Sequence, residues 1–384
     1  MDDGIDVAII GGGVIGLAIA RELSKDYSVM LFEKSHFLGE GQSGHFSGVI
    51  HSGLYYPKKS KKAIHCVQGN KDIYSFCETY NVPYKSAPKV IVAKQIGEKG
   101  VLEELLRCGM ENKVSGVRLL TQKEIQLYEP HVAGVCALLC PTTGIIDGPT
   151  FLKTLAGHAQ EQGAHILKNT EITKISQRSE GFVLSAVYYE KNAAAKKEEL
   201  FSYVAKDRGE ICAKYVINAA GLYSDVTAKL INPESPWEII PVRGEYYEVH
   251  GEKAKLIRGN VYPVPEELGL GIHLTPTMGD IMTIGPSAKV IALKDDYEHD
   301  RLSKELFYVA ANSFFRDKPF SLEDLKMGYT GIRAKLKNGT DWVIARDKKY
   351  SHAIHCVGID SPGFTASLSI AKNEIKVLID EMEK

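Results

Sequence analysis

The feature that most constrains the fold is a strand, a glycine-rich turn and a helix at the start of the chain. Ile5 to Ile10 is an apolar, β-branched run that predicts a buried strand, and Gly11 to Gly13 follow it directly. Val14 to Ser24 has the composition of a helix, and Ser28 to Glu33 predicts a second strand. Units of this kind build parallel sheets with helices packed on them. The first part of the chain is therefore expected to be a parallel α/β domain.

The turn between strand and helix has the spacing GxGxxG, with glycine at 11, 13 and 16. These glycines permit a tight turn and a close approach of the backbone to a pyrophosphate, which the N-terminus of the helix attracts. Glu33 ends the second strand, where it can accept hydrogen bonds from ribose hydroxyls and disfavours the 2′-phosphate of NADP. The pattern predicts a dinucleotide site and leaves NAD and FAD open. Its candidate residues are Gly11, Gly13, Val14, Ile15, Gly16, Glu33 and Lys34.

Composition excludes several classes of protein. The chain has 384 residues, enough for about two domains whose core needs no disulfide or metal. Its 47 Lys and Arg balance 48 Asp and Glu, for a net charge of −1, whereas nucleic-acid binders normally carry a basic surplus. We therefore expect no nucleic acid among its partners. The seven cysteines form no CxxC pair, which indicates reduced thiols, and no metal site is expected.

The sequence shows no membrane-spanning pattern. The longest uncharged apolar stretch, Val7 to Ala20, has 14 residues, whereas a bilayer span needs about 20. Asp2 and Asp3 precede the first strand, where a targeting segment would carry basic residues. We expect a cytoplasmic protein with at most peripheral membrane contact.

The rest of the chain predicts a second, different domain. Ile239 to Ser287 alternates short strands with Gly and Pro turns, which is typical of an antiparallel sheet. Leu322 to Met327 and the segment from Ser361 to the end of the chain are predicted helices. The charged stretch Asn192 to Glu199 is interpreted as a solvated insertion. The expected fold class is α/β: a Rossmann-like domain with a parallel sheet plus an α+β domain with a mainly antiparallel sheet.

Four further segments carry a resemblance to known flavoproteins. They are residues 42–56 (QSGHFSGVIHSGLYY), 216–225 (VINAAGLYSD), 331–334 (GIRA) and 360–365 (DSPGFT). Together with the glycine turn they resemble the superfamily of D-amino-acid oxidase and glycerol-3-phosphate dehydrogenase. In that superfamily these segments close on FAD, so the resemblance implies FAD as cofactor.

Within this superfamily the chain looks most like the L-2-hydroxyglutarate dehydrogenase family. The blocks that carry this likeness are residues 47–56, 241–246 (PVRGEY), 260–265 (NVYPVP), 271–276 (GIHLTP) and 328–333 (GYTGIR). The expected FAD-binding domain is discontinuous, at 1–85, 145–235 and 328–384, and the expected substrate domain covers 86–144 and 236–327.

The resemblance assigns further residues to the cofactor. The loop of small residues after position 41 would run along the FAD phosphates toward the isoalloxazine ring, and Ile172 would meet the adenine. The start of the last helix, with Ser361 as its N-cap and Pro362 in its first turn, would stabilise negative charge on the reduced flavin. The cofactor-binding residues implied in this way are Gln42, Ser43, Ser47, Gly48, Val49, His51, Ile172, Ala219, Ala220, Gly221, Gly331, Arg333, Pro362, Gly363, Phe364 and Thr365.

The remaining candidates concern the substrate. Arg333 can hold a carboxylate through two parallel hydrogen bonds, and Arg243 is either a second cationic contact or a structural ion pair. His51 and His273 are candidate bases, because an ordinary histidine pKa near 6.5 suits proton transfer around neutrality; alternatively, either one only packs or contacts the flavin. Three tyrosines are candidates for the pocket lining or for ordinary packing: Tyr55, Tyr246 and Tyr262.

The resemblance implies oxidation of a small 2-hydroxy acid, L-2-hydroxyglutarate to 2-oxoglutarate, by hydride transfer to flavin N5. Electrons would then pass to oxygen or a quinone. One alternative keeps the FAD and changes the substrate to glycerol-3-phosphate or an amino acid. Two others are a non-catalytic flavin-binding scaffold and an NAD-dependent dehydrogenase, and a visible spectrum of the purified protein distinguishes the latter.

Overall fold

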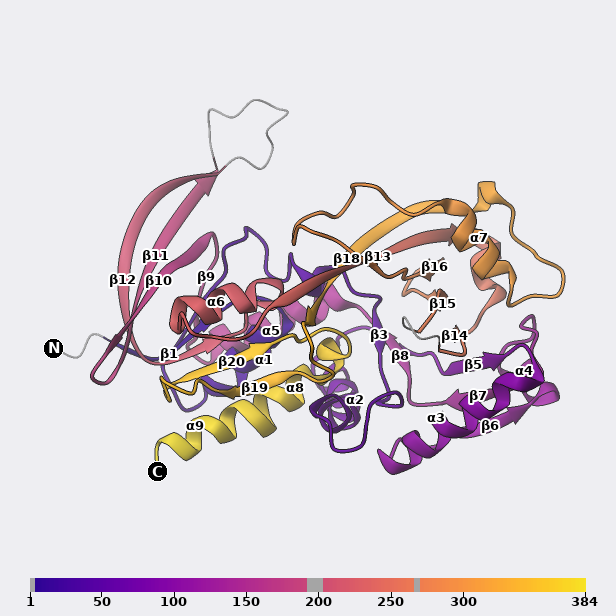
Figure 1. Cartoon of the computed structure of the whole chain (residues 1–384), viewed down its shortest axis with the longest axis horizontal. Helices are drawn as coiled ribbons and strands as arrows, with labels where there is room; N and C mark the ends of the chain where they lie inside the picture. The colour runs from indigo at the N-terminus through magenta and orange to yellow at the C-terminus, as the bar shows by residue number, and fades with distance from the viewer. Residues whose placement is uncertain (1–3, 192–202, 266–269) are drawn as a thin grey trace.

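The chain folds into two halves that are each built around a sheet. The computed structural model describes residues 4–191, 203–265 and 270–384. Figure 1 shows the N-terminal strands and the C-terminal helices together in one half, and the second sheet in the other. The predicted insertion at 192–199 lies outside the described residues. The expected combination of a parallel sheet with a mainly antiparallel one is confirmed.

The first sheet has eight strands and contains the predicted strand–turn–helix unit. Its central strands β9, β2, β1, β12 and β20 are parallel neighbours, while β10 and β11 extend it as an antiparallel hairpin onto β12. β19 pairs with β20 at the other side. The strands are β1 (Ile5–Ile10), β2 (Val29–Phe32), β9 (His165–Leu167), β10 (Thr170–Arg178), β11 (Gly181–Lys191), β12 (Tyr203–Asn218), β19 (Val343–Arg346) and β20 (Ala353–Val357).

Helices cover both faces of this sheet because its central strands are apolar on both sides. On one face α1 packs against α5 and α8, and α8 packs against α2. On the other face α6 closes a separate apolar cluster over β1 and β12. These helices are α1 (Val14–Leu23), α2 (Lys61–Tyr80), α5 (Gly148–Glu161), α6 (Ser224–Ile231) and α8 (Gly363–Ile370), with α9 (Lys376–Met382) at the end of the chain.

The second sheet has nine strands, and its pairs are antiparallel except for β14 beside β5. Two long strands, β13 and β18, pair along most of their length and reach toward the first half (Figure 1). Its core lies under α7 and α4. The strands are β5 (Lys89–Ala93), β6 (Arg118–Thr121), β7 (Cys136–Cys140), β13 (Ile239–His250), β14 (Asn260–Pro263), β15 (His273–Pro276), β16 (Ile281–Gly285), β17 (Lys289–Val290) and β18 (Lys326–Leu336); the helices are α3 (Lys99–Glu111), α4 (Gln122–Tyr128) and α7 (Lys304–Asn312).

A small three-stranded sheet joins the two halves. It consists of β3 (Val49–Ile50), β8 (Gly144–Ile146) and β4 (Tyr84–Ser86), in the order β3-β8-β4. Because β3 continues the glycine-rich loop and β4 leads into β5, this sheet connects the predicted cofactor loop to the substrate half.

Two expectations about the C-terminal third are wrong. Leu322 to Met327 is not a helix: a short 3₁₀ turn ends at Asp324 and β18 begins at Lys326, because pairing with β13 outweighs the local apolar spacing. The last helix begins at Gly363 without a cap from Ser361, and a π-helical segment at 371–375 interrupts it. The domain division stays a prediction, but its boundary at 328 falls inside β18, which belongs to the second sheet.

Candidate functional site

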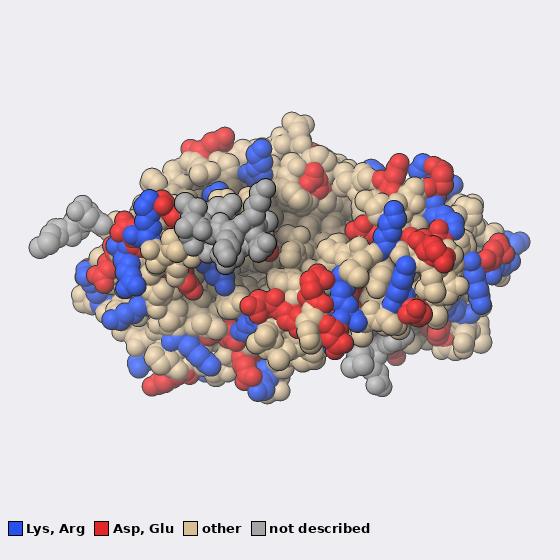
Figure 2. Space-filling model, turned by 90° about the horizontal axis from the view of Figure 1, so that it is seen from above, with Lys and Arg blue, Asp and Glu red and all other residues tan. Residues whose placement is uncertain are grey.

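A large cavity lies between the two halves. Its volume is about 1130 Å³, and its lining runs from the glycine turn after β1 to the second sheet at β14 and β15. Figure 2 shows a hollow near the middle of the molecule whose visible walls are mostly uncharged. Small-molecule pockets usually measure about 300–1,000 Å³, so this cavity has room for a dinucleotide and a small substrate together.

The glycine turn brings three backbone segments together at one end of the cavity. Gly11 has φ +115°, and a Cβ atom there would lie 2.4 Å from the carbonyl oxygen of Ala219, at the end of β12. α1 begins after Gly13, and the Val14 N–H donates to Ser43 Oγ at 2.9 Å. This places the N-terminus of α1 and a strand end without bulky side chains at the cavity wall, as a pyrophosphate requires.

Glu33 is held in a fixed orientation beside this turn. One carboxylate oxygen accepts from the Gly12 N–H at 2.7 Å, and the other accepts from the Ser35 N–H at 2.8 Å. A carboxylate offers about four acceptor positions, so lone pairs remain for hydroxyl donors from the cavity. The neighbouring Lys34 lies with its ammonium 3.5 Å from the centre of the Tyr223 ring.

The loop that leads to His51 is fastened to the C-terminal helix. The His51 N–H donates to Thr365 Oγ1 at 3.0 Å, and Asn70 on α2 donates to the His51 carbonyl at 2.9 Å. Gly69 lets α2 and α8 cross closely, because a Cβ atom there would lie 2.3 Å from the Thr365 carbonyl oxygen. The His51 backbone is thus fixed by two helices that sequence reasoning did not connect.

The structure brings the predicted site residues together with four exceptions. All of them line the cavity except Gly16, Gly48, Thr365 and Arg243. Gly16 serves helix packing, since a Cβ atom would lie 1.9 Å from the Gly11 carbonyl oxygen. Gly48 supplies a positive φ of +74°, and Thr365 anchors His51. These three shape the cavity from behind its wall.

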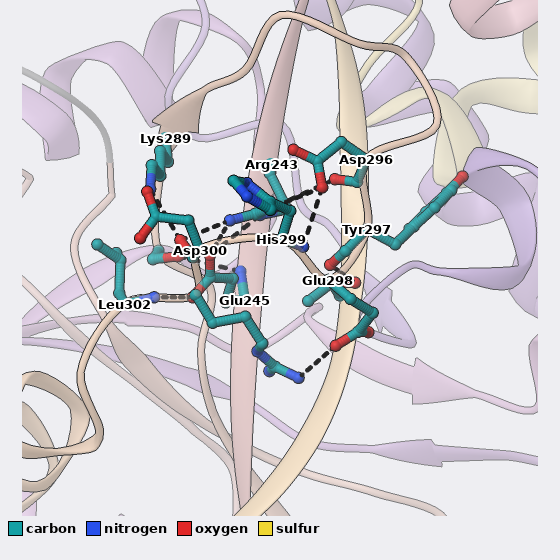
Figure 3. Close-up of polar contacts among 12 residues, drawn as sticks. Arg243, Glu245, Lys289, Asp296, Tyr297, Glu298, His299, Asp300 and Leu302 are labelled. Atoms are coloured by element: carbon teal, nitrogen blue, oxygen red, sulfur yellow. Dashed lines mark hydrogen bonds and ion pairs between the residues drawn. The ribbon is translucent and has the colours of Figure 1, made fainter.

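Arg243 does not face the cavity, and its assignment as a substrate-binding residue is wrong. Its side chain is fully buried and bonded to the equally buried Glu245 at 3.0 Å and to Asp296 at 3.1 Å (Figure 3). It also donates to the Asp300 carbonyl at 2.9 Å, while Glu245 accepts from the Leu302 N–H at 2.7 Å. Arg243 therefore fastens the loop over residues 296–302, part of which lines the cavity.

Arg333 follows Ile332, the residue of β18 that pairs with Arg243, so its side chain points to the opposite face of the sheet from the Arg243 network. Its guanidinium donates to the Ser287 carbonyl at 3.1 Å, and no Asp or Glu pairs with it among the residues that the structure describes. Nearby, Tyr246 stacks on Tyr329 with ring centres 4.5 Å apart. A cavity-facing guanidinium without a carboxylate partner is suited to binding an anionic ligand.

The two candidate histidines lie in the same part of the cavity. His51 Nε2 is 3.2 Å from Ser361 Oγ, and His273 Nδ1 is 2.9 Å from the Gly271 carbonyl oxygen. Because a carbonyl only accepts, Nδ1 of His273 carries the proton and Nε2 keeps a free lone pair. The His273 ring stacks on Tyr262 with centres 3.6 Å apart.

Burial changes the protonation expected for both histidines. It lowers the pKa of His273 to about 3, and the nearby charges of Lys89 and Arg333 act in the same direction. Burial, reinforced by Lys89 and His273, also holds the pKa of His51 well below its usual range. Both rings are therefore neutral at pH 7, and the expected ordinary pKa near 6.5 does not apply.

Sequence reasoning missed several charged residues of this region. Lys62 on α2 and Lys335 on β18 both pair with Asp360, at 3.0 and 3.3 Å, and all three line the cavity. Lys89 lies fully buried behind Tyr262. Its signal was present in the sequence: a lysine heads the otherwise apolar strand KVIVA.

The sequence profile of the FAD dependent oxidoreductase (DAO) family matches residues 6–373. The chain belongs to this family. Its cofactor is FAD, which confirms the choice over NAD.

Curated relatives and a solved structure agree with this assignment. The chain is 36% identical over 301 residues to bovine (Bos taurus) "L-2-hydroxyglutarate dehydrogenase, mitochondrial", covering 76% of this chain and 62% of the relative. It therefore spans less than two thirds of that relative's length. It is 31% identical over 406 residues to L-2-hydroxyglutarate dehydrogenase of Indibacter alkaliphilus, covering 95% and 96% of the two chains. The dithionite-reduced L-alpha-glycerophosphate oxidase of Mycoplasma pneumoniae with FAD bound superposes with a TM-score of 0.81 at 27% identity, covering 98% and 95%.

The observed residues fit FAD. The glycine turn, the open N-terminus of α1 and the oriented Glu33 suit a pyrophosphate and an adenosine ribose. The remaining cavity length, past Val49 toward Arg333, leaves space for a ring system and a substrate.

Within the described ranges, no helix is long and apolar enough to cross a membrane.

Gly13 generates the first prediction. A Gly13→Val side chain would begin 3.1 Å from Ser43 Oγ and fill the space in front of the α1 N-terminus, so the purified variant should contain little FAD. The ratio of flavin to protein absorbance measures this. Gly157→Ala on α5, where an added Cβ meets nothing within 4 Å, is the control and should keep its flavin. A yellow, fully loaded Gly13→Val protein would contradict the assignment.

Arg243 generates the second prediction. Arg243→Met leaves the buried Glu245 without its cation, which should lower the free energy of unfolding by about 3–5 kcal/mol. Urea unfolding of the flavin-loaded protein measures the change. The exposed Arg178 on β10 is the control, and Arg178→Met should stay within about 0.5 kcal/mol of the parent. A stable Arg243→Met protein that lost only substrate affinity would restore the ligand role.

Proposed function

We propose that this FAD-dependent oxidoreductase oxidises L-2-hydroxyglutarate to 2-oxoglutarate. The observation that carries the proposal is a cation, Arg333, in one cavity with two neutral imidazoles; no described Asp or Glu pairs with it. The relatives named L-2-hydroxyglutarate dehydrogenase support the same substrate.

FAD, when bound, supplies the acceptor for a hydride and later hands the electrons to oxygen or a quinone-like acceptor. Its phosphates and ribose would be held by the glycine turn and Glu33, and its ring end by the loop at 42–51 and the start of α8. The N-terminus of α8 favours negative charge nearby through the helix dipole.

Arg333 is proposed to bind the carboxylate next to the carbon that is oxidised. Its hydrogen bond to the Ser287 carbonyl limits the motion of the guanidinium and leaves other N–H donors for the ligand. A fixed guanidinium orients a carboxylate through two parallel hydrogen bonds. This would place the 2-hydroxyl group toward the histidines.

His273 is the better proposed base of the two histidines. Its Nδ1–H is committed to the Gly271 carbonyl, so Nε2 is an acceptor at every pH where the ring is neutral. His51 faces the hydroxyl of Ser361, which can donate or accept, and so its tautomer is not fixed in this way. The low pKa of His273 arises partly from the two cations Lys89 and Arg333. Anionic groups bound to these cations would weaken that repulsion and make the ring a stronger base.

A second candidate keeps the site and changes the substrate to glycerol-3-phosphate. It is favoured by the structural similarity to the Mycoplasma pneumoniae glycerophosphate oxidase. A dye-linked assay of the purified flavoprotein with L- and D-2-hydroxyglutarate, glycerol-3-phosphate and a set of amino acids separates these candidates. Reduction by L-2-hydroxyglutarate alone supports the first; no reduction by any of them favours a non-catalytic flavoprotein.

The Arg333 proposal predicts a penalty even for a charge-conserving change. Arg333→Lys keeps the charge but loses the two parallel hydrogen bonds of the guanidinium. This should cost about 1.5–3 kcal/mol, or about 10- to 150-fold in kcat/KM for the hydroxy acid. Steady-state kinetics measure this, and Arg178→Met is again the control. An unchanged kcat/KM would place the carboxylate site elsewhere.

The histidine proposal predicts both a rate and a pH profile. His273→Ala should slow substrate-dependent flavin reduction by at least about 100-fold, measured by anaerobic stopped flow, and His51→Ala serves as the comparison. A base must be unprotonated, so activity falls as the pH drops through its pKa. Burial lowers both histidine pKa values, so the fall of kcat/KM on the acid side should occur below pH 6.5. Wild-type reduction rates in both variants would exclude either histidine as the base.

A further inference from the structure

Lys89 is a buried cation whose ammonium group has no carboxylate or carbonyl partner among the described residues. It heads β5, an interior strand of the second sheet, between Asn260 of β14 and Cys140 of β7. Only 1% of it is exposed. Over the whole of the described chain, it has neither a hydrogen bond nor an ion pair, and its contacts are with aromatic rings. Lysine is almost never buried in this way without a partner.

The rings that contact Lys89 belong to the cavity wall. Its Nζ lies 4.0 Å from the centre of the Tyr262 ring and 5.1 Å from that of Tyr55, and both tyrosines line the cavity. The Tyr55 hydroxyl is itself buried without a hydrogen-bond partner among the described residues. Buried polar groups normally have partners, so an unpaired ammonium over the ring of a tyrosine whose hydroxyl is also unpaired indicates that a ligand supplies what the described residues lack.

The groups that face Lys89 offer no negative charge. Burial raises the pKa of Cys140 on β7 to about 11 and that of Cys66 on α2 further still, so both thiols are neutral. His51 and His273 are also neutral, because burial and the positive charge of Lys89 lower the pKa of both. Tyr55 and Tyr262 are neutral phenols, because burial raises both pKa values. No carboxylate contributes to the electrostatic surroundings of this ammonium.

We propose that Lys89, with the Tyr55 hydroxyl, binds a second carboxylate of the substrate, the one distal from the oxidised carbon. The site would then select dicarboxylic 2-hydroxy acids, with Arg333 on one carboxylate and Lys89 on the other. The inference rests on the proposed function and adds the residue that sets its specificity. Lys89 and His273 contact the same ring, with the Lys89 ammonium 4.0 Å and the imidazole centre 3.6 Å from the centre of Tyr262. The 2-hydroxyl would therefore lie near the histidine, between the two carboxylates.

The charge of Lys89 is available under ordinary conditions. Burial lowers its pKa to about 8, so the ammonium predominates at pH 7 and is lost as the pH rises through that value. Because only the protonated form binds a carboxylate, kcat/KM for a dicarboxylate should fall above about pH 8. A monocarboxylic substrate of equal length should not show this limb.

The test compares two substrates in Lys89→Met. For L-2-hydroxyglutarate, kcat/KM should fall by about 10- to 150-fold, as expected for one charged hydrogen bond, and its limb near pH 8 should disappear. For L-2-hydroxypentanoate, which lacks the distal carboxylate, kcat/KM should be unchanged or rise. Lys153→Met, at an exposed position of α5, is the control and should alter neither. Equal losses for both substrates would overturn the proposal.

A second measurement does not depend on turnover. Glutarate carries both carboxylates without the hydroxyl, and it should raise the Tm of the flavin-loaded parent more than pentanoate does; Lys89→Met should abolish the difference. The variant itself should have a higher Tm at pH 7, because it removes an unpaired buried charge. A lower Tm with an intact glutarate effect would identify a purely structural lysine.

These outcomes separate the inference from the proposed function. If the parent protein does not oxidise L-2-hydroxyglutarate, the proposed function fails, while the glutarate shift still tests Lys89. If the parent oxidises it and Lys89→Met keeps the same ratio between the two substrates, only the inference fails. If Lys89→Met does not fold, Lys89→Gln removes the charge with a polar side chain of similar length, and the same results are expected.

Discussion

The close contact between the turn after β1 and the end of β12 is the constraint on which the site depends. Gly11 adopts a backbone conformation that L side chains rarely adopt and passes so near Ala219 that no Cβ atom fits. That contact aligns the carboxyl ends of two parallel strands. It also aims α1 at the same crevice and brings Glu33, at the end of β2, within hydrogen-bonding distance of the turn. The crevice outside the carboxyl ends of parallel strands is where such sheets bind nucleotides.

The substrate end is built differently, by fastening segments from both halves to one another. Thr365 at the start of α8 holds the backbone of His51, and Tyr329 on β18 donates to the Phe46 carbonyl at 2.9 Å. Gly331 on the same strand passes so close to His45 that a Cβ atom would lie 2.3 Å from its carbonyl oxygen. The loop therefore lies between a helix of the first half and a strand of the second, and the cavity wall contains residues from both.

Two buried cations illustrate how burial alone does not reveal a role. Arg243 and Lys89 are both inaccessible, but Arg243 has two carboxylates and two carbonyls around it, whereas Lys89 has aromatic rings and neutral thiols. A fully paired ion fixes a loop, so its replacement should mainly change the free energy of unfolding. An unpaired ion costs stability, so it is the one that binding measurements should detect.

The features that depend on local chemistry follow from the sequence alone. The glycine turn, the strand before it and Glu33 after it require a parallel α/β unit, and the resemblance of several short blocks led to FAD, which family membership confirms. Nearly all the residues that the sequence singled out line the cavity. The other features depend on the tertiary structure. The motif of Arg243 leaves a ligand contact and an ion pair open, and only the fold places Glu245 and Asp296 on it. The pKa of His273 lies below its ordinary value because the side chain is buried, and that burial depends on segments that are distant in the sequence. Lys89 stood out in its strand, but whether it had a partner depended on β14, β7 and α2, which are far from it in sequence. Charges act through space, and the sequence does not contain the distances between them.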